Sequence, residues 1–221
     1  MAGPASLSPF GTPGDQTAPQ VWFVDDWLLV AEKPADLLAV PGRGEAGRDH
    51  LWGRVQVPYP DALIVHRLDM ATSGLIVMAR GLESQRRLHR AFAQRLVHKT
   101  YHALVEGQVD AEQGTIAAPL ICDWPNRPRQ IVDTERGKPA LTHWRVLERL
   151  ARHTRLTLEP VTGRSHQLRV HLQSIGHPIC GDTLYNPAAK ASSRLALHAA
   201  ELRLAHPEGG QPCHFVSPVP F

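Results

Sequence analysis

A short polar loop holds the residues best suited to catalysis. Between two apolar runs, at residues 62–65 and 75–79, the segment 66–74 reads His-Arg-Leu-Asp-Met-Ala-Thr-Ser-Gly and places Arg67 beside Asp69. Polar groups held between buried strands are costly unless they are paired or functional. Asp69 could simply cap a turn or pair with Arg67. Alternatively, an Asp kept ionised by a neighbouring Arg could serve as a nucleophile or charge stabiliser.

A second candidate segment, residues 162–169, reads Thr-Gly-Arg-Ser-His-Gln-Leu-Arg. It predicts a helix start, in which Ser165 could act as a simple cap. His166 and Arg169 are expected on the face opposite an apolar stripe. Arg164 beside the positive helix end would favour an anion. Contact with phosphate and pairing with a carboxylate both remain open.

Three further features could contact a nucleic acid. Tyr101 follows Lys99 in a strand-like run and could be an ordinary core aromatic. A basic cluster around residues 86–99 could be a solvated helix face or a surface that tracks phosphates. The loop 123–129 carries Trp124 and Arg127, and it could stack on a base or be only a turn.

Motifs for metals and nucleotide cofactors are missing from the sequence. The histidines are scattered, and there is no H-E-x-x-H, paired Cys-x-x-Cys or zinc deaminase signature. Neither a phosphate-binding Gly-rich loop ending in Gly-Lys nor a G-x-S-x-G elbow occurs. We therefore expect no metal site and no cofactor.

The bulk composition is that of an ordinary folded protein. The chain has 221 residues, 43% hydrophobic and 20% charged, with a net charge of +3. This mildly basic balance permits an RNA partner without requiring one. Three cysteines, no signal-peptide pattern and no long apolar stretch suggest reduced thiols in a cytoplasmic protein.

The expected organisation is a tail followed by one domain. Residues 1–20 are rich in Pro, Gly, Ser and Thr, which predicts disorder, and residues 21–221 should form the domain. Helices are expected at 83–97, with Leu88, Phe92 and Leu96 on its apolar face, and from 165 to a stop at Gly176. Strands are expected at 21–24, 28–31, 62–65, 75–79, 100–106, 141–147, 155–159, 195–204 and 214–216. This mixture predicts an α+β fold around a mixed or antiparallel sheet flanked by helices and loops.

The motifs together resemble one enzyme family. The run 66–75 is similar to the H-R-L-D-x-x-T-S-G-L motif of the RluA family of pseudouridine synthases. Lys99-x-Tyr101, then 163–169, then the Leu-x-Leu-His-Ala run at 195–199 agree with that family in order. Segments 37–43 and 119–128 resemble its short, dual-specificity subgroup. As in that subgroup, we expect no S4 RNA-binding domain before the catalytic domain.

The resemblance implies an activity and residue roles. The enzyme would isomerise uridine to pseudouridine without a cofactor, in 23S rRNA and the tRNA anticodon stem-loop. Independently of the resemblance, we expect it to be a monomer. Asp69 would be the nucleophile, Tyr101 would stack on the base, and Arg169 would pair with Asp69. Arg67 would keep the uridine flipped out. The remaining RNA contacts implied are Arg86, Arg90, Lys99, Arg127, Arg164 and His166.

Two other functions remain possible from the sequence. One is a catalytically silent RNA-binding protein on the same fold. The other is a glycosidase-type hydrolase, but such enzymes usually need two carboxylates, and the central motif supplies only Asp69.

Overall fold

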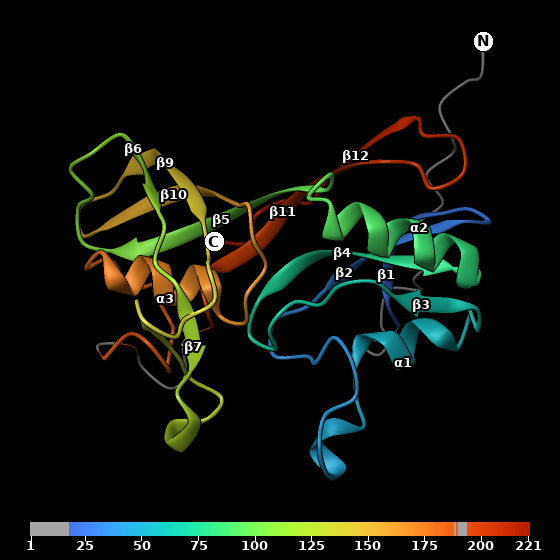
Figure 1. Cartoon of the computed structure of the whole chain (residues 1–221), viewed down its shortest axis with the longest axis horizontal. Coiled ribbons are helices and arrows are strands. Elements are labelled where there is room, and N and C mark those ends of the chain that lie inside the picture. Colours follow the sequence, from blue (N-terminus) through green and yellow to red (C-terminus); the bar gives the residue numbers. More distant parts are fainter. Residues whose placement is uncertain (1–17, 188, 190–193) are drawn as a thin grey trace. The chain divides into compact units, whose positions relative to one another are not determined.

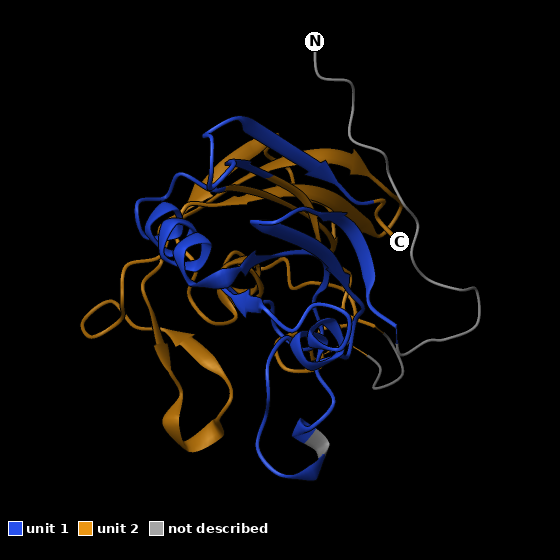
Figure 2. Cartoon of the chain, turned by 90° about the vertical axis from the view of Figure 1, so that its right-hand side faces the viewer, with its two compact units in different colours: residues 1–97, 203–217 blue, residues 98–202, 218–221 orange. Residues whose placement is uncertain are grey.

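The computed structural model describes residues 18–187, 189 and 194–221. The chain divides into two compact units, drawn in different colours in Figure 2. Unit 1 comprises Met1–Val97 and Arg203–Ser217, and unit 2 comprises His98–Leu202 and Pro218–Phe221. Most of the expected disordered tail, residues 1–17, lies outside the described residues.

Unit 1 is built on a small antiparallel sheet. Its strands are β1 (Gln20–Val24), β2 (Leu28–Lys33), β3 (Ala62–Ile64) and β4 (Ser73–Arg80). Both β2 and β3 pair with β4. Seven of the eight residues in β4 are buried, as expected for a continuous apolar run covered on both faces.

Helices cover both faces of this sheet. Figure 1 shows α1 (Leu51–Gln56) and α2 (Gly81–Ala93) on opposite sides of it. The core beneath α1 joins Leu51 and Val55 to Ile76 and Met78 of β4. A 3₁₀ turn at Glu45–Gly47 precedes α1, and β12 (Pro212–Val216) completes the unit.

Unit 2 contains a four-stranded antiparallel arrangement, β5–β10–β9–β6. The strands are β5 (His98–Glu106), β6 (Gln113–Ile116), β9 (Thr142–Arg149) and β10 (His153–Pro160). The helix α3 (Gln167–Ser174) lies against this sheet (Figure 1). The strand β11 (Leu197–Ala205) leads from unit 2 back into unit 1.

A separate hairpin in unit 2 joins β7 (Leu120–Cys122) to β8 (Gln130–Val132). A 3₁₀ turn at Trp124–Asn126 lies at its tip. Together the two units have an α+β composition, which confirms the expected fold class. No helix in the described part of the chain is long and apolar enough to cross a membrane.

One helix end was predicted wrongly. The sequence placed the end of α2 at Val97, but the helix stops at Ala93 and Leu96 is 58% exposed. Arg95 adopts a left-handed conformation, with φ of 60°, and Leu96 N–H donates to the Ala91 carbonyl. This is a Schellman ending made without glycine, so the sequence carries no stop signal there.

Candidate active site

The Asp69 loop is tightly anchored in unit 1. It joins β3 to β4, with Asp69 half-buried and Arg67 exposed on either side of buried Leu68. His66 stacks on Phe92 of α2, with ring centroids 4.7 Å apart. The His66 Nε2 atom accepts a hydrogen bond from the Val77 N–H of β4 at 3.0 Å, so this nitrogen is unprotonated.

Lys33 fixes the residue that follows Asp69. This lysine is fully buried at the end of β2. Its ammonium donates to three backbone carbonyls, those of Pro34, Leu37 and Met70, each at 2.7 Å. The Asp69 carbonyl in turn accepts from the Thr72 N–H at 3.1 Å. Residues before and after Asp69 are therefore held in place, and the position of its carboxylate is restricted by the backbone.

Lys33 was not among the candidate residues predicted from the sequence. A buried lysine with carbonyl partners leaves no local sequence signal, because two of its acceptors belong to residues four and 37 positions away.

In unit 2, Gln167 organises the segment that precedes α3. Its side-chain oxygen accepts from the Arg164 N–H at 3.0 Å and from the Thr162 hydroxyl at 2.7 Å. Its amide nitrogen donates to the Leu141 carbonyl and to the Thr142 hydroxyl, both at 3.0 Å. The position before the helix is His166 in a left-handed conformation, not the serine cap considered from sequence.

Arg169 is buried and paired with a carboxylate. Arg169 was predicted to lie on the helix face opposite the apolar residues, but it is only 4% exposed. Its Nε and Nη2 donate to the two Asp182 oxygens at 2.8 and 2.7 Å, a bidentate ion pair. Of the two possibilities left open for this segment, pairing with a carboxylate is confirmed for Arg169, with Asp182 as one partner. Pairing with Asp69 stays a prediction.

His166 has a partner inside unit 2. Its Nδ1 lies 2.7 Å from the hydroxyl of Tyr185, and that hydroxyl accepts from the Gln130 N–H at 2.7 Å. This chain of bonds connects the start of α3 to the β7–β8 hairpin. Arg164 keeps an exposed side chain, although its Nε donates to the Pro139 carbonyl at 3.0 Å.

Tyr101 and Lys99 lie on β5, two residues apart, so their side chains emerge on the same face of the strand. Both are half-buried. Burial lowers the pKa of Lys99. Tyr101 is held at its backbone by pairing with Leu158 of β10.

The basic residues proposed for RNA contact are mostly exposed. Arg86 and Arg90 lie one turn apart on α2. Arg87 between them donates to Glu83 at 2.8 Å and to the Pro207 carbonyl, while Arg86 lies 3.8 Å from the same Glu83 carboxylate. Arg127 lies on the tip of the β7–β8 hairpin, with its guanidinium 4.2 Å from the centre of the Trp124 ring. Trp124 itself is 67% exposed, as a stacking residue requires.

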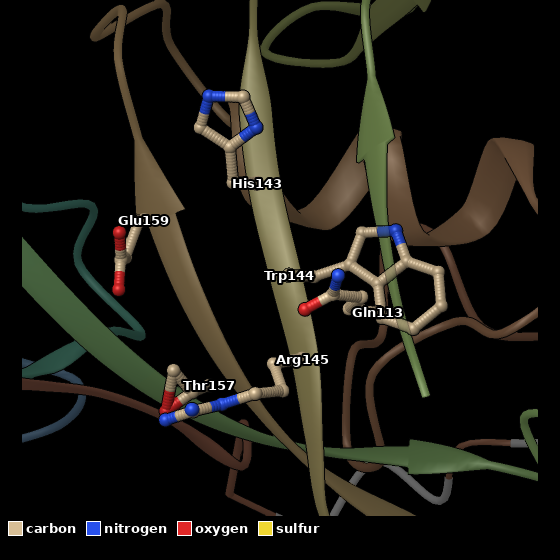
Figure 3. Close-up of a pocket in the computed structure, with 6 residues that line it drawn as sticks. All are labelled: Gln113, His143, Trp144, Arg145, Thr157 and Glu159. Carbon is tan, nitrogen blue, oxygen red and sulfur yellow. The ribbon is translucent and has the colours of Figure 1, made fainter. Parts of the chain in front are cut away.

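A shallow pocket of about 220 Å³ lies on the sheet of unit 2, and the sequence did not anticipate it. Figure 3 shows Arg145 reaching toward Thr157, with which it is paired across β9 and β10. The lining residues are Gln113, His143, Trp144, Arg145, Thr157 and Glu159. None of the residues predicted from sequence lines this pocket.

Comparison with known proteins identifies the class. Residues 27–174 match the family model described as RNA pseudouridylate synthase. The chain therefore belongs to the RNA pseudouridylate synthase family and is an RNA-modifying isomerase. The matched segment contains the Asp69 loop, β5 and all of α3.

Within this family, the chain is similar to several named pseudouridine synthases. The chain is 50% identical over 204 residues to the dual-specificity RNA pseudouridine synthase RluA of Yersinia pestis, covering 91% of this chain and 99% of the relative. It is 48% identical to the protein of that name from Escherichia coli K12, covering 91% and 93%. Among solved structures, human RNA pseudouridylate synthase domain containing 1 has a TM-score of 0.79 at 28% identity, covering 96% of this chain and 87% of the other.

Proposed function

We propose that this enzyme converts specific uridines to pseudouridine in the tRNA anticodon stem-loop and in 23S rRNA. Support for two substrates comes from relatives named dual-specificity that share about half of their residues with this chain. Because these RNA substrates are cytoplasmic, we propose that the enzyme acts in the cytoplasm. We also propose that the enzyme acts as a monomer.

The observation that carries the proposal is the Asp69 loop. Its carboxylate is half-buried on a backbone held by Lys33, by the His66–Val77 bond and by buried Leu68. Such preorganisation places a nucleophile at a reacting carbon with little loss of entropy. One carboxylate can serve both halves of the reaction. The N1–C1′ bond breaks, a C5–C1′ bond forms, C5 loses its proton and N1 gains one.

Supporting roles follow from the chemistry of the other residues. Tyr101 is proposed to stack on the uracil, and Arg169 to use guanidinium donors beyond those bound to Asp182 to pair with Asp69. Arg67, exposed beside Asp69, is proposed to hold the uridine out of its stack, which offsets an unstacking cost of a few kcal/mol. Arg86, Arg90, Lys99, Arg127, Arg164 and His166 remain proposed RNA contacts.

The decisive experiment compares Asp69→Asn with wild type by release of tritium from RNA labelled at C5 of uridine. Asp26→Asn is the matched control, because Asp26 is exposed in the β1–β2 turn. We expect Asp69→Asn to abolish release while RNA affinity changes little, since phosphate contacts supply most of the affinity. The control should retain wild-type turnover.

Other outcomes distinguish the alternatives. Retention of a tenth of the wild-type rate by Asp69→Asn would refute the nucleophile assignment. Binding without any tritium release by the wild-type protein would instead indicate a silent RNA-binding protein. Free uracil among the products would indicate a hydrolase.

A further inference from the structure

Three side chains with metal-binding atoms meet in unit 2, apart from the residues proposed for catalysis. Glu106 ends β5 and His153 begins β10, and the two are direct partners in the antiparallel pairing. Cys180 comes from the segment that follows α3. One ligand atom from each residue lies within 4.8 Å of the other two, and His153 Nε2 is 3.3 Å from Glu106 Oε2.

The backbone holds this arrangement rigidly. The Cys180 N–H donates to the Leu104 carbonyl, and the Cys180 carbonyl accepts from the Ala196 N–H, both at 2.9 Å. The preceding residue, Ile179, forms a β-bridge with Val105. Cys180 is thereby fixed beside the end of β5 by main-chain bonds on both sides.

A buried amide orients the carboxylate. Asn186, only 5% exposed, donates to Glu106 Oε1 at 3.0 Å and to the Ile179 carbonyl at 3.2 Å. This bond leaves Oε2 of Glu106 directed to His153. Metal ligands in proteins are commonly oriented by an outer hydrogen bond of this kind.

The donor set suits a zinc ion. Zinc binds thiolate, imidazole and carboxylate at about 2.0–2.3 Å in tetrahedral geometry, which places ligand atoms about 3.3–3.8 Å apart. The observed spacings require a contraction of about 1 Å at most. His153 and Glu106 are each more than a third exposed at the side chain, so the ion and a water ligand can enter from solvent.

We propose that Glu106, His153 and Cys180 form a binding site for one Zn²⁺, with water as the fourth ligand. The Zn–S bond forms as the thiol loses its proton to solvent, and no oxidation is involved. The ion would cross-link the end of β5 and the start of β10 to the segment after α3. Its role is structural, and no step of the isomerisation passes through it.

An ordinary ion pair with a neighbouring thiol is the competing explanation for the same geometry. Burial, and then the Glu106 carboxylate, raise the pKa of the Cys180 thiol to about 12. Without a metal this thiol is therefore protonated at neutral pH and resembles any half-buried cysteine. The two explanations differ in what happens when a thiophilic cation is added.

The test uses the full chain after treatment with a chelator and dialysis. Co²⁺ is added first, because a cobalt–thiolate bond gives charge-transfer absorption in the near ultraviolet. Zn²⁺ is then titrated to displace it. We expect one equivalent of Co²⁺ to produce the band, one equivalent of Zn²⁺ to abolish it, and Zn²⁺ to raise the unfolding temperature.

Variants locate the site. Cys180→Ser should remove the cobalt band, and His153→Gln should weaken Zn²⁺ affinity about 100-fold or more, since loss of outer partners alone costs about 10- to 100-fold. Cys213→Ser is the matched control, because Cys213 lies in unit 1, and it should bind as wild type does. Circular dichroism checks that each variant is folded.

The proposal is overturned if folded wild-type protein shows no cobalt–thiolate band, or if Cys180→Ser and wild type bind Zn²⁺ equally. Tritium release is measured in parallel on the same samples. Loss of metal binding with turnover intact would count only against the zinc site, whereas turnover failure with the cobalt band present would count only against the proposed function.

Discussion

At the scale of single residues, burial of ionisable side chains determines much of the chemistry of this chain. Lys33 and Arg169 are buried as cations, Lys33 bound to backbone carbonyls and Arg169 paired with the Asp182 carboxylate. Unpaired buried charge would be strongly destabilising, so each cation is in effect tied to one arrangement of its neighbours. Buried histidines respond differently, because they can remain neutral.

His198 of β11 provides a test of this contrast. It is fully buried, and burial first, then Arg194 and His102, lower its pKa from 6.5 to about 4. Between those values the unfolded chain binds the extra proton and the folded chain does not. The contribution of His198 to the free energy of unfolding is therefore fully present above pH 6.5. It is lost as the pH falls toward 4, by up to about 3 kcal/mol.

Urea unfolding at pH 7, 5.5 and 4.5 measures this loss. His198→Gln should flatten the pH dependence of the unfolding free energy, whereas His89→Gln, on the exposed surface of α2, should leave it as in wild type. Equal slopes for wild type and His198→Gln would show that another group causes the acid sensitivity.

At the scale of elements, helix ends and loop anchors fix where functional side chains lie. The helix α3 ends in a Schellman motif, in which Gly176 has φ of 86° and the His177 N–H donates to the Leu172 carbonyl. This end was predicted from the glycine. The end of α2 was not predicted, because Arg95 takes the left-handed position that a glycine occupies in α3.

The Lys33 anchor of the Asp69 loop can be tested by Lys33→Met. Methionine has a side chain of similar length, but it leaves the carbonyls of Pro34, Leu37 and Met70 without their shared donor. We expect a loss of about 2–4 kcal/mol in unfolding free energy, because each unsatisfied buried group costs about 1–3 kcal/mol and loss of the buried charge offsets part of it.

Turnover should fall more than RNA affinity, because the loop carries Asp69 while the proposed phosphate contacts lie elsewhere. Chemical unfolding and tritium release measure the two effects. Lys138→Met, at an exposed lysine, is the control. Wild-type stability and rate in Lys33→Met would exclude a positioning role for Lys33.

At the scale of the whole molecule, charge and size limit the kind of RNA that the chain can recognise. Its net charge is only +3, and its exposed cations include Arg86, Arg90 and Arg127. Such a surface favours a compact RNA element over a large folded one. Proteins read RNA sequence best where bases can splay out, in loops.

We therefore expect an isolated anticodon stem-loop to be modified nearly as fast as whole tRNA. The same uridine within a full duplex should react far more slowly, because flipping it also breaks a base pair. Affinity should fall with salt, with a logarithmic slope of roughly −0.7 to −0.9 per phosphate contacted. Rates of tritium release on matched loop and duplex substrates provide the measurement. Comparable rates would point to recognition of helix shape.

The sequence by itself determined the α+β class, most of the strands and the Asp69 loop. These features depend on residues close together in the chain: the apolar run of β4, the turn residues before it and the glycine after α3. Short elements such as α1, β6, β7 and β8 were missed, because segments of three to six residues carry little periodicity.

Only the tertiary structure decided which partners the buried polar groups take. Arg169 binds Asp182, Lys33 reaches Met70, and Glu106 meets His153 and Cys180 through strand pairing and a β-bridge. Local spacing shows that a residue can carry charge or bind a ligand. It cannot show which distant group lies within 3 Å, because that depends on strand register and packing, which the whole chain sets cooperatively.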